Sequence, residues 1–93
     1  MYNLIFTHTY EQKAKRFIKK HAEIIKQYTK TLQLLELNPF HPSLRLHQFN
    51  TCNFEGFSVS INMTYRISLE FLVTEKDIVL INIGDHQDIY EKK

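Results

Sequence analysis

Arg66 and His86 are the residues of this sequence whose chemistry best suits a phosphodiester. A guanidinium can stabilise the charge that develops on a phosphate, and an imidazole can take up or release a proton near neutral pH. A turn centred between positions 75 and 76 would place Arg66 opposite Asp85 and within one residue of His86. The sequence therefore predicts that an arginine and a histidine meet at one end of a small sheet.

A second predicted hairpin brings Ser60 to the same place. Residues 57–61 and 65–73 both alternate apolar and polar side chains, as strands with one buried face do. A turn centred on Met63 would put Ser60 directly opposite Arg66, with their side chains about 5 Å apart. Because Arg66 is out of phase with the apolar residues of its strand, we expect it on the face that no helix covers.

These residues also have purely structural interpretations. Arg66 could form a surface ion pair with Asp85. His86, which follows a glycine and an aspartate, could be a turn residue, and Tyr90 could anchor the C-terminal tail by packing. The predicted strand pairing brings no other candidate site residue near His8, His21 or His41, so we expect structural roles for these three histidines.

Other kinds of catalytic chemistry find no support in the sequence. It contains no HExxH or HxH pattern, and its single cysteine, Cys52, allows no disulfide and no cysteine-based zinc site. Its two glycines are too few for a glycine-rich phosphate loop or a nucleophile elbow. We predict no metal and no cofactor, expect Cys52 to be a small buried residue, and retain acid–base catalysis on a phosphodiester.

The elements that must position these residues can be predicted from periodicity. Residues 2–6 indicate a strand, and Thr9 with Gln12 matches a capping box that opens a helix. A break near His21 separates it from a second helical stripe, which ends at Asn38–Pro39 because proline disfavours a helical residue before it. The later elements are an extended segment at 44–47 and antiparallel strands at 57–61, 65–73 and 78–83. The prediction is an α+β fold with an N-terminal strand, a helical hairpin and an antiparallel three-stranded meander, whose apolar face the helices cover.

Length and composition set further limits. A chain of 93 residues predicts one domain, residues 1–93. No apolar run reaches the length of a membrane span, and the N-terminus lacks the apolar core of a signal peptide. We therefore expect a cytoplasmic protein that has no contact with a membrane.

Positive charge is concentrated in the first half of the sequence. Residues 1–50 carry eight basic and three acidic side chains, and residues 51–93 carry four and seven. Such a basic surface can follow a phosphate backbone, although it can equally be the solvated side of two surface helices. The candidate RNA-binding residues are Lys13, Lys15, Arg16, Lys19, Lys20, Lys26 and Arg45.

Three segments of the sequence are distinctive: the loop LNPFHPSLRLHQF, the segment TYRISLEF and the end of the last strand, LINIGDHQDIY. Together with the order of the elements, they resemble the RelE/ParE superfamily of toxins from type II toxin–antitoxin pairs. The resemblance covers essentially the whole chain and implies a fold like that of the microbial ribonucleases.

The resemblance also implies roles for individual residues. Arg66 falls where RelE-type toxins have an arginine that stabilises the pentacovalent phosphate. His86 matches a C-terminal histidine of YafQ-like toxins that acts as general acid or base, Tyr90 matches an aromatic residue that positions the RNA, and His47 resembles a further histidine of that branch. The sequence departs from the pattern at Ser60 and Thr64, where YafQ-like toxins have a histidine and an aspartate, and it lacks the lysine cluster of the RelE branch.

For function, the resemblance implies a metal-independent endoribonuclease that cleaves mRNA in the ribosomal A site. The 2′-hydroxyl would attack the adjacent phosphate, with His47 and His86 sharing the proton transfers in an order that the sequence leaves open. The implied partners are an antitoxin, the ribosome with its rRNA, mRNA, and operator DNA through the antitoxin complex. Two alternatives are a ParE-like toxin that poisons gyrase by protein binding and a catalytically inactive relative that binds its antitoxin and operator DNA.

Overall fold

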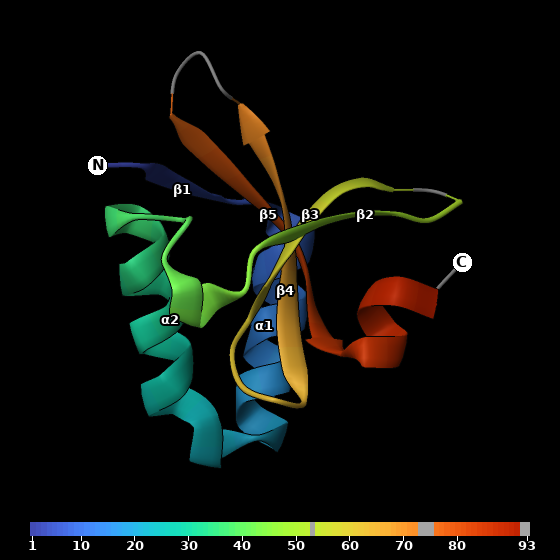
Figure 1. The fold of residues 1–93 in the computed structure, drawn as a ribbon. Coiled ribbons are helices and arrows are strands. Elements are labelled where there is room, and N and C mark those ends of the chain that lie inside the picture. Colours follow the sequence, from blue (N-terminus) through green and yellow to red (C-terminus); the bar gives the residue numbers. More distant parts are fainter. Residues whose placement is uncertain (53, 73–75, 92–93) are drawn as a thin grey trace.

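A computed structural model describes residues 1–52, 54–72 and 76–91 as one mixed sheet with helices packed against it (Figure 1). The strands are β1 (Asn3–Phe6), β2 (His47–Asn50), β3 (Glu55–Ser60), β4 (Tyr65–Leu72) and β5 (Asp77–Asp85), and they lie in the order β1-β5-β4-β3-β2. The helices are α1 (His8–Lys20), α2 (Ile25–Leu37), the short 3-10 helices η1 (Ala22–Ile24) and η2 (Pro42–Leu44), and the C-terminal π-helix η4 (Gln87–Glu91). None of the described helices is long and apolar enough to span a membrane.

The predicted α+β architecture is confirmed, with a larger sheet than expected. β1 runs parallel to β5, and the other neighbouring strands are antiparallel. The predicted extended segment at 44–47 is in fact η2 followed by β2, which begins at His47 and adds an edge strand to the meander. His47 thereby reaches the sheet itself.

α1 begins two residues earlier than the capping box at Thr9 indicated. Thr7 is the N-cap, because its hydroxyl oxygen accepts a hydrogen bond from the Tyr10 amide at 3.2 Å. The same hydroxyl donates to the Leu80 carbonyl at 3.1 Å, so the helix start is tied to β5. α2 ends at Leu37, directly before Asn38 and Pro39 as predicted.

The apolar residues of the sheet and helices form a core on one side of the sheet. Tyr10 and Leu35 from the helices and Ile67, Leu69 and Leu80 from the strands are fully buried there. Successive side chains of β4 point to alternate faces of the sheet, so Arg66, which precedes Ile67, lies on the face opposite the core. In Figure 1, α1 lies behind the sheet and η4 stands at the lower right, beside the end of β5.

The predicted register is right for one hairpin and wrong for the other. Ser60 pairs with Arg66, as expected. Arg66 pairs with Gly84 and not with Asp85, which lies opposite Tyr65. Leu72 pairs with Asp77, so the end of the hairpin near the turn is two positions away from the predicted register. The ladder is irregular between Ser68 and Leu69, whose partners are Asn82 and Leu80, and this extra residue in β5 brings Arg66 one position back, from Ile83 to Gly84. Positions 73–75, at the end of the predicted strand and in the predicted turn, lie outside the described residues.

Candidate active site

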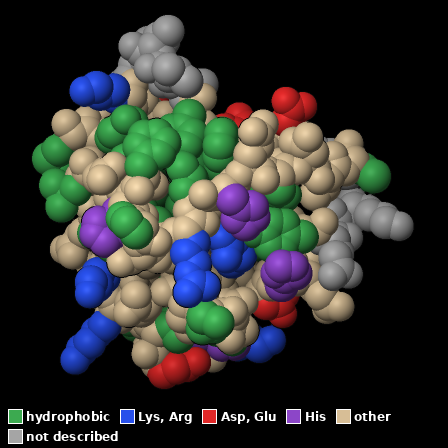
Figure 2. Space-filling view, in the orientation of Figure 1, with side chains coloured by type: hydrophobic (Ala, Val, Ile, Leu, Met, Phe, Trp, Pro, Cys, Tyr) green, Lys and Arg blue, Asp and Glu red, His purple; other side chains and the backbone are tan. Residues whose placement is uncertain are grey.

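Four side chains from three strands and the C-terminal helix form a hydrogen-bonded cluster on the open face of the sheet. Arg66 Nε donates to Ser58 Oγ at 3.1 Å, and an Arg66 terminal nitrogen lies 3.2 Å from His47 Nδ1. The Tyr90 hydroxyl lies 2.5 Å from Ser58 Oγ and 3.0 Å from His47 Nε2. We call Arg66, His47, Tyr90 and Ser58 the Arg66 cluster. Lys/Arg and His side chains gather near the middle of this face, over β3 and β4 and beside η4 (Figure 2).

The directions of these hydrogen bonds follow from the chemistry of arginine. A guanidinium has donors and no acceptor, so His47 Nδ1 must accept from Arg66 and carry no proton. The neutral His47 ring then bears its proton on Nε2 and donates to the Tyr90 oxygen, and Tyr90 in turn donates to Ser58. Arg66 thus selects the tautomer of His47 and the direction of the whole chain of hydrogen bonds.

Arg66 is held by the backbone as well. Its terminal nitrogen donates to the Arg45 carbonyl at 3.1 Å. Arg45 has a φ of 50°, the left-handed region that is costly for a residue other than glycine. This local strain turns a carbonyl toward the guanidinium. Within the described part of the chain Arg66 makes no ion pair with Asp85, so that structural interpretation is wrong.

η4 carries Tyr90 into the cluster, and a reciprocal cap anchors the helix. The Asp88 amide donates to Asp85 Oδ1 at 3.0 Å, and the Asp85 amide donates to Asp88 Oδ2 at 3.1 Å. Gly84 permits this close approach, because a Cβ there would lie 2.5 Å from the Asp88 carboxylate. Asp85 therefore positions η4 and does not contact Arg66.

Aromatic rings surround Tyr90. The His86 ring lies 4.3 Å from it between centroids, the Phe49 ring meets it edge-on at 4.7 Å, and the His47 ring is nearly parallel to it at 5.7 Å. His86 is exposed and makes no hydrogen bond to any described residue. Both candidate acid–base histidines therefore contact the same tyrosine, and His86 remains open to solvent.

Two other predicted site neighbours do not join the cluster. The Ser60 hydroxyl donates to the Asn62 carbonyl at 2.6 Å, although Ser60 lies opposite Arg66. Thr64 is exposed, and its amide donates to the Asn62 side chain at 2.8 Å. Both residues shape the turn between β3 and β4.

Ser58 is the cluster residue that the sequence analysis missed. It is fully buried, and it lies diagonally across the β3–β4 pair from Arg66. A diagonal neighbour is within reach of a long side chain. The sequence does contain a signal for it, since Ser58 and Ser60 alternate onto the same face as Arg66, but a predicted register points first to the directly opposed residue, Ser60.

The candidate RNA-binding residues do not form one surface. Lys13, Arg16 and Lys20 line a polar pocket beside β5, whereas Lys15 and Lys19 line a groove between α1 and α2. Lys26 is exposed on α2, and Arg45 lies beside the β3–β4 turn near Met63.

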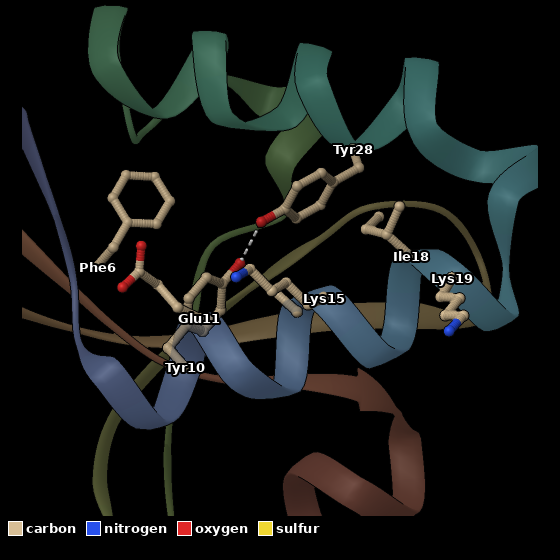
Figure 3. A pocket seen from close by; sticks show the side chains of 8 residues that line it. Phe6, Tyr10, Glu11, Lys15, Ile18, Lys19 and Tyr28 are labelled. Atoms are coloured by element: carbon tan, nitrogen blue, oxygen red, sulfur yellow. Dashed lines mark hydrogen bonds between the residues drawn. The ribbon is translucent and has the colours of Figure 1, made fainter.

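The groove between α1 and α2 has a volume of about 430 Å³ and a largely apolar lining (Figure 3). Tyr10 from α1 and Tyr28 from α2 join their hydroxyls across it at 2.8 Å. Burial raises the pKa of both hydroxyls, so both remain protonated near neutral pH. This groove offers no acid–base group and is separate from the Arg66 cluster.

Three residues outside the Arg66 cluster had predicted structural roles: His21, His41 and Cys52. His21 packs against Tyr65, whose hydroxyl lies 3.3 Å from its Nδ1, and so has the expected structural role. His41 accepts from the Ser43 amide at 3.1 Å. Cys52 is exposed, so its predicted burial is wrong, because it follows the edge strand β2 and not a core strand. The residues that the structure describes include no group of three or more potential metal ligands.

No protein-family model matches the sequence, and no curated protein matches it. Solved structures do match. A chain of the E. coli DinJ–YafQ complex superimposes with a TM-score of 0.74 at 12% identity, covering 97% of this chain and 99% of that one. The YoeB/ParE toxin from Agrobacterium tumefaciens superimposes with a TM-score of 0.69 at 14% identity, covering 90% of this chain and 98% of that one. A chain of the archaeal RelE–RelB complex from Pyrococcus horikoshii OT3 has a TM-score of 0.68 at 12% identity, covering 90% of this chain and 93% of that one. The resemblance seen in the sequence is confirmed for the fold: this chain has the fold of the RelE/ParE toxin superfamily.

Proposed function

We propose that this protein is the toxin of a type II toxin–antitoxin pair and that it is an endoribonuclease that cleaves mRNA in the ribosomal A site. One observation supports this proposal above all others. On the open face of a RelE/ParE-type sheet, Arg66 and His47 are hydrogen-bonded to each other and to Tyr90, with His86 in contact with the same tyrosine. A cationic clamp can stabilise the phosphorane charge and two imidazoles can carry out both proton transfers, so this set of groups suits cleavage of RNA without a metal.

In the proposed reaction the scissile phosphate takes the place of His47 as a partner of Arg66. The guanidinium then stabilises the charge that develops on the phosphorane. Release from Arg66 leaves the lone pair of His47 Nδ1 free to accept the proton of the ribose 2′-hydroxyl, so His47 is assigned as the general base. The 2′-oxygen forms a bond to phosphorus as the bond to the 5′-oxygen breaks.

His86 is assigned as the general acid. It is exposed beside Tyr90 and has no guanidinium against its ring, so it can carry the proton that the leaving 5′-oxygen needs. The products are a 2′,3′-cyclic phosphate and a 5′-hydroxyl. Tyr90 stacks on or hydrogen-bonds to the nucleotide beside the scissile bond. Ser58 contacts no substrate and positions Arg66 and Tyr90.

The proposed partners are an antitoxin, the ribosome and mRNA. The DinJ–YafQ and RelE–RelB structures are complexes, and DinJ–YafQ is a toxin–antitoxin complex, which supports an antitoxin for this chain. One small domain with a single arginine and two histidines at its site has few groups with which to select a base sequence. The ribosome would therefore supply the geometry of the substrate.

Mapping of transcript ends in cells tests the proposal. Controlled expression of the chain should produce new 5′-hydroxyl ends within coding sequences, and the Arg66→Ala variant at equal expression should produce none. Growth arrest by the unaltered chain without new transcript ends would contradict the nuclease function.

A further inference from the structure

Three of the basic residues of α1 converge on a pocket that is distinct from the Arg66 cluster. Lys13, Arg16 and Lys20 recur at helical spacing and line a hollow of about 290 Å³, whose lining is mainly polar. The other lining residues are Phe17 and His21 from the end of α1, Asn82 and Ile83 from β5, and Asp88 from η4. We call this hollow the α1–β5 pocket.

The cations of this pocket, Lys13, Arg16 and Lys20, form no ion pairs with the residues that the structure describes. Like charges three and four residues apart on a helix destabilise it slightly, by about 0.2–0.5 kcal/mol per pair. Three cations without an ion pair around one polar hollow create a local positive potential that attracts anions.

The pocket also contains a carboxylate, that of Asp88. This carboxylate accepts a hydrogen bond from the Asp85 amide and belongs to the cap of η4. With three cations and one carboxylate, the lining keeps a net charge of +2, counting His21 as neutral. The lining therefore attracts anions, among them the singly charged phosphodiesters of an RNA backbone, and Asp88 lowers their affinity.

The location of the pocket connects it with the Arg66 cluster. β1 pairs with β5 only as far as Leu80 among the described residues, so the outer edge of β5 beyond Leu80 is open. Asn82 in the pocket is two residues from Gly84, which pairs with Arg66, and two strand residues span roughly 7 Å. η4 links the two places, because Asp88 lines the pocket and Tyr90 belongs to the Arg66 cluster.

We propose that the α1–β5 pocket binds a backbone phosphate of the RNA strand that is cleaved at Arg66, within a few nucleotides of the scissile bond. This inference rests on the proposed nuclease function and adds a second phosphate subsite to it. The strand passes from the Arg66 cluster over η4 to the open edge of β5. The lysines on the other side of α1, Lys15 and Lys19, take no part in this contact.

Two triple variants with equal loss of charge test the proposal. Lys13→Gln/Arg16→Gln/Lys20→Gln removes the cations of the pocket, and Lys15→Gln/Lys19→Gln/Lys26→Gln removes three cations elsewhere on the same helical hairpin. The probe is a short single-stranded RNA with 2′-O-methyl groups, which cannot be cleaved because its nucleophile is blocked, and its binding is followed by fluorescence anisotropy at several salt concentrations.

The pocket variant should bind this RNA roughly tenfold more weakly or worse, and the slope of log affinity against log salt should fall by about 0.7, as expected for the loss of one phosphate contact. The control variant should stay within about twofold of the unaltered protein. Asp88→Asn, which keeps the hydrogen-bond acceptor of the η4 cap and removes its charge, should bind more tightly. Such a gain cannot result from misfolding.

If both triple variants weakened RNA binding equally, the proposal for the pocket would be overturned, since only the overall charge of the protein would then matter. Unchanged RNA binding by the pocket variant together with loss of antitoxin binding would overturn it too, because the surface would then serve a protein partner. If the proposed nuclease function itself is wrong, the result differs: the unaltered protein will neither bind this RNA nor cleave message on ribosomes.

Discussion

Replacing Ser58 by alanine should slow catalysis while leaving the protein folded. Ser58 Oγ accepts a hydrogen bond from the charged Arg66 Nε and lies 2.5 Å from the Tyr90 hydroxyl. A hydrogen bond to a charged group contributes about 1.5–3 kcal/mol. If that contribution serves to hold Arg66 at the transition state, its loss slows the reaction roughly 10- to 150-fold, since 1.36 kcal/mol is a factor of ten. Arg66 keeps its bonds to Arg45 and His47, so we expect the lower end of that range.

The assay is single-turnover cleavage of message, with thermal unfolding measured on the same samples. Because Ser58 touches no substrate in the proposed reaction, kcat should fall and KM should stay nearly constant. Ser58→Thr, which restores the hydroxyl, should recover most of the rate. Ser68→Ala is the matched control, because Ser68 is buried directly opposite Ser58 and makes no hydrogen bond to the described Arg66 cluster. A Ser58→Ala rate equal to that of the Ser68→Ala variant would refute the positioning role.

Three further predictions concern the reaction and the partner. Arg66→Ala should lose about 10²- to 10³-fold in rate and abolish growth arrest, as expected for removal of one preorganised charge donor, and unchanged toxicity at equal expression would exclude Arg66 from the site. The pH–rate profile should be bell-shaped, because one histidine acts as base and the other as acid. A substrate with sulfur in place of the leaving 5′-oxygen needs no general acid, so it should restore the rate of His86→Ala but not that of His47→Ala. Rescue of both variants or of neither would contradict the assigned roles. A reading frame beside the gene should encode an antitoxin of roughly 50 to 100 residues, at the lower end of the usual domain size, and its co-expression should restore growth. Failure of every neighbouring frame to restore growth would count against the toxin proposal.

The elements that could be predicted from the sequence are those with strong local signals. Alternation identified the strands that carry Ser60 and Arg66, and Asn38–Pro39 ended α2 where expected. The start of α1 was misplaced because Thr7 and Thr9 are both plausible caps, and the choice depends on Leu80, which is far away in the sequence.

The details of the site depend on contacts that the sequence does not display. The β4–β5 pairs near the turn are offset by two residues from the predicted register, and the extra residue in β5 restores only one of them, so Arg66 lies opposite Gly84 and not Asp85. Neither feature has a local signature among apolar strand residues. The hydrogen bonds of Arg66 to Ser58 and to the Arg45 carbonyl depend on side-chain reach across strands. The sequence therefore predicted the face of the sheet and most of the residues on it, but not how they are joined.

Cleavage in a reconstituted translation system tests the central claim most directly. With 70S ribosomes stalled on a defined message, the protein should cut within the codon in the A site and leave a 2′,3′-cyclic phosphate, and the same message free in solution should survive much longer, because the site has few groups for base readout. Arg66→Ala should leave the message whole under both conditions. Intact message on ribosomes, together with stabilised gyrase–DNA cleavage complexes and inhibited supercoiling, would contradict the nuclease and support a gyrase poison on the same fold.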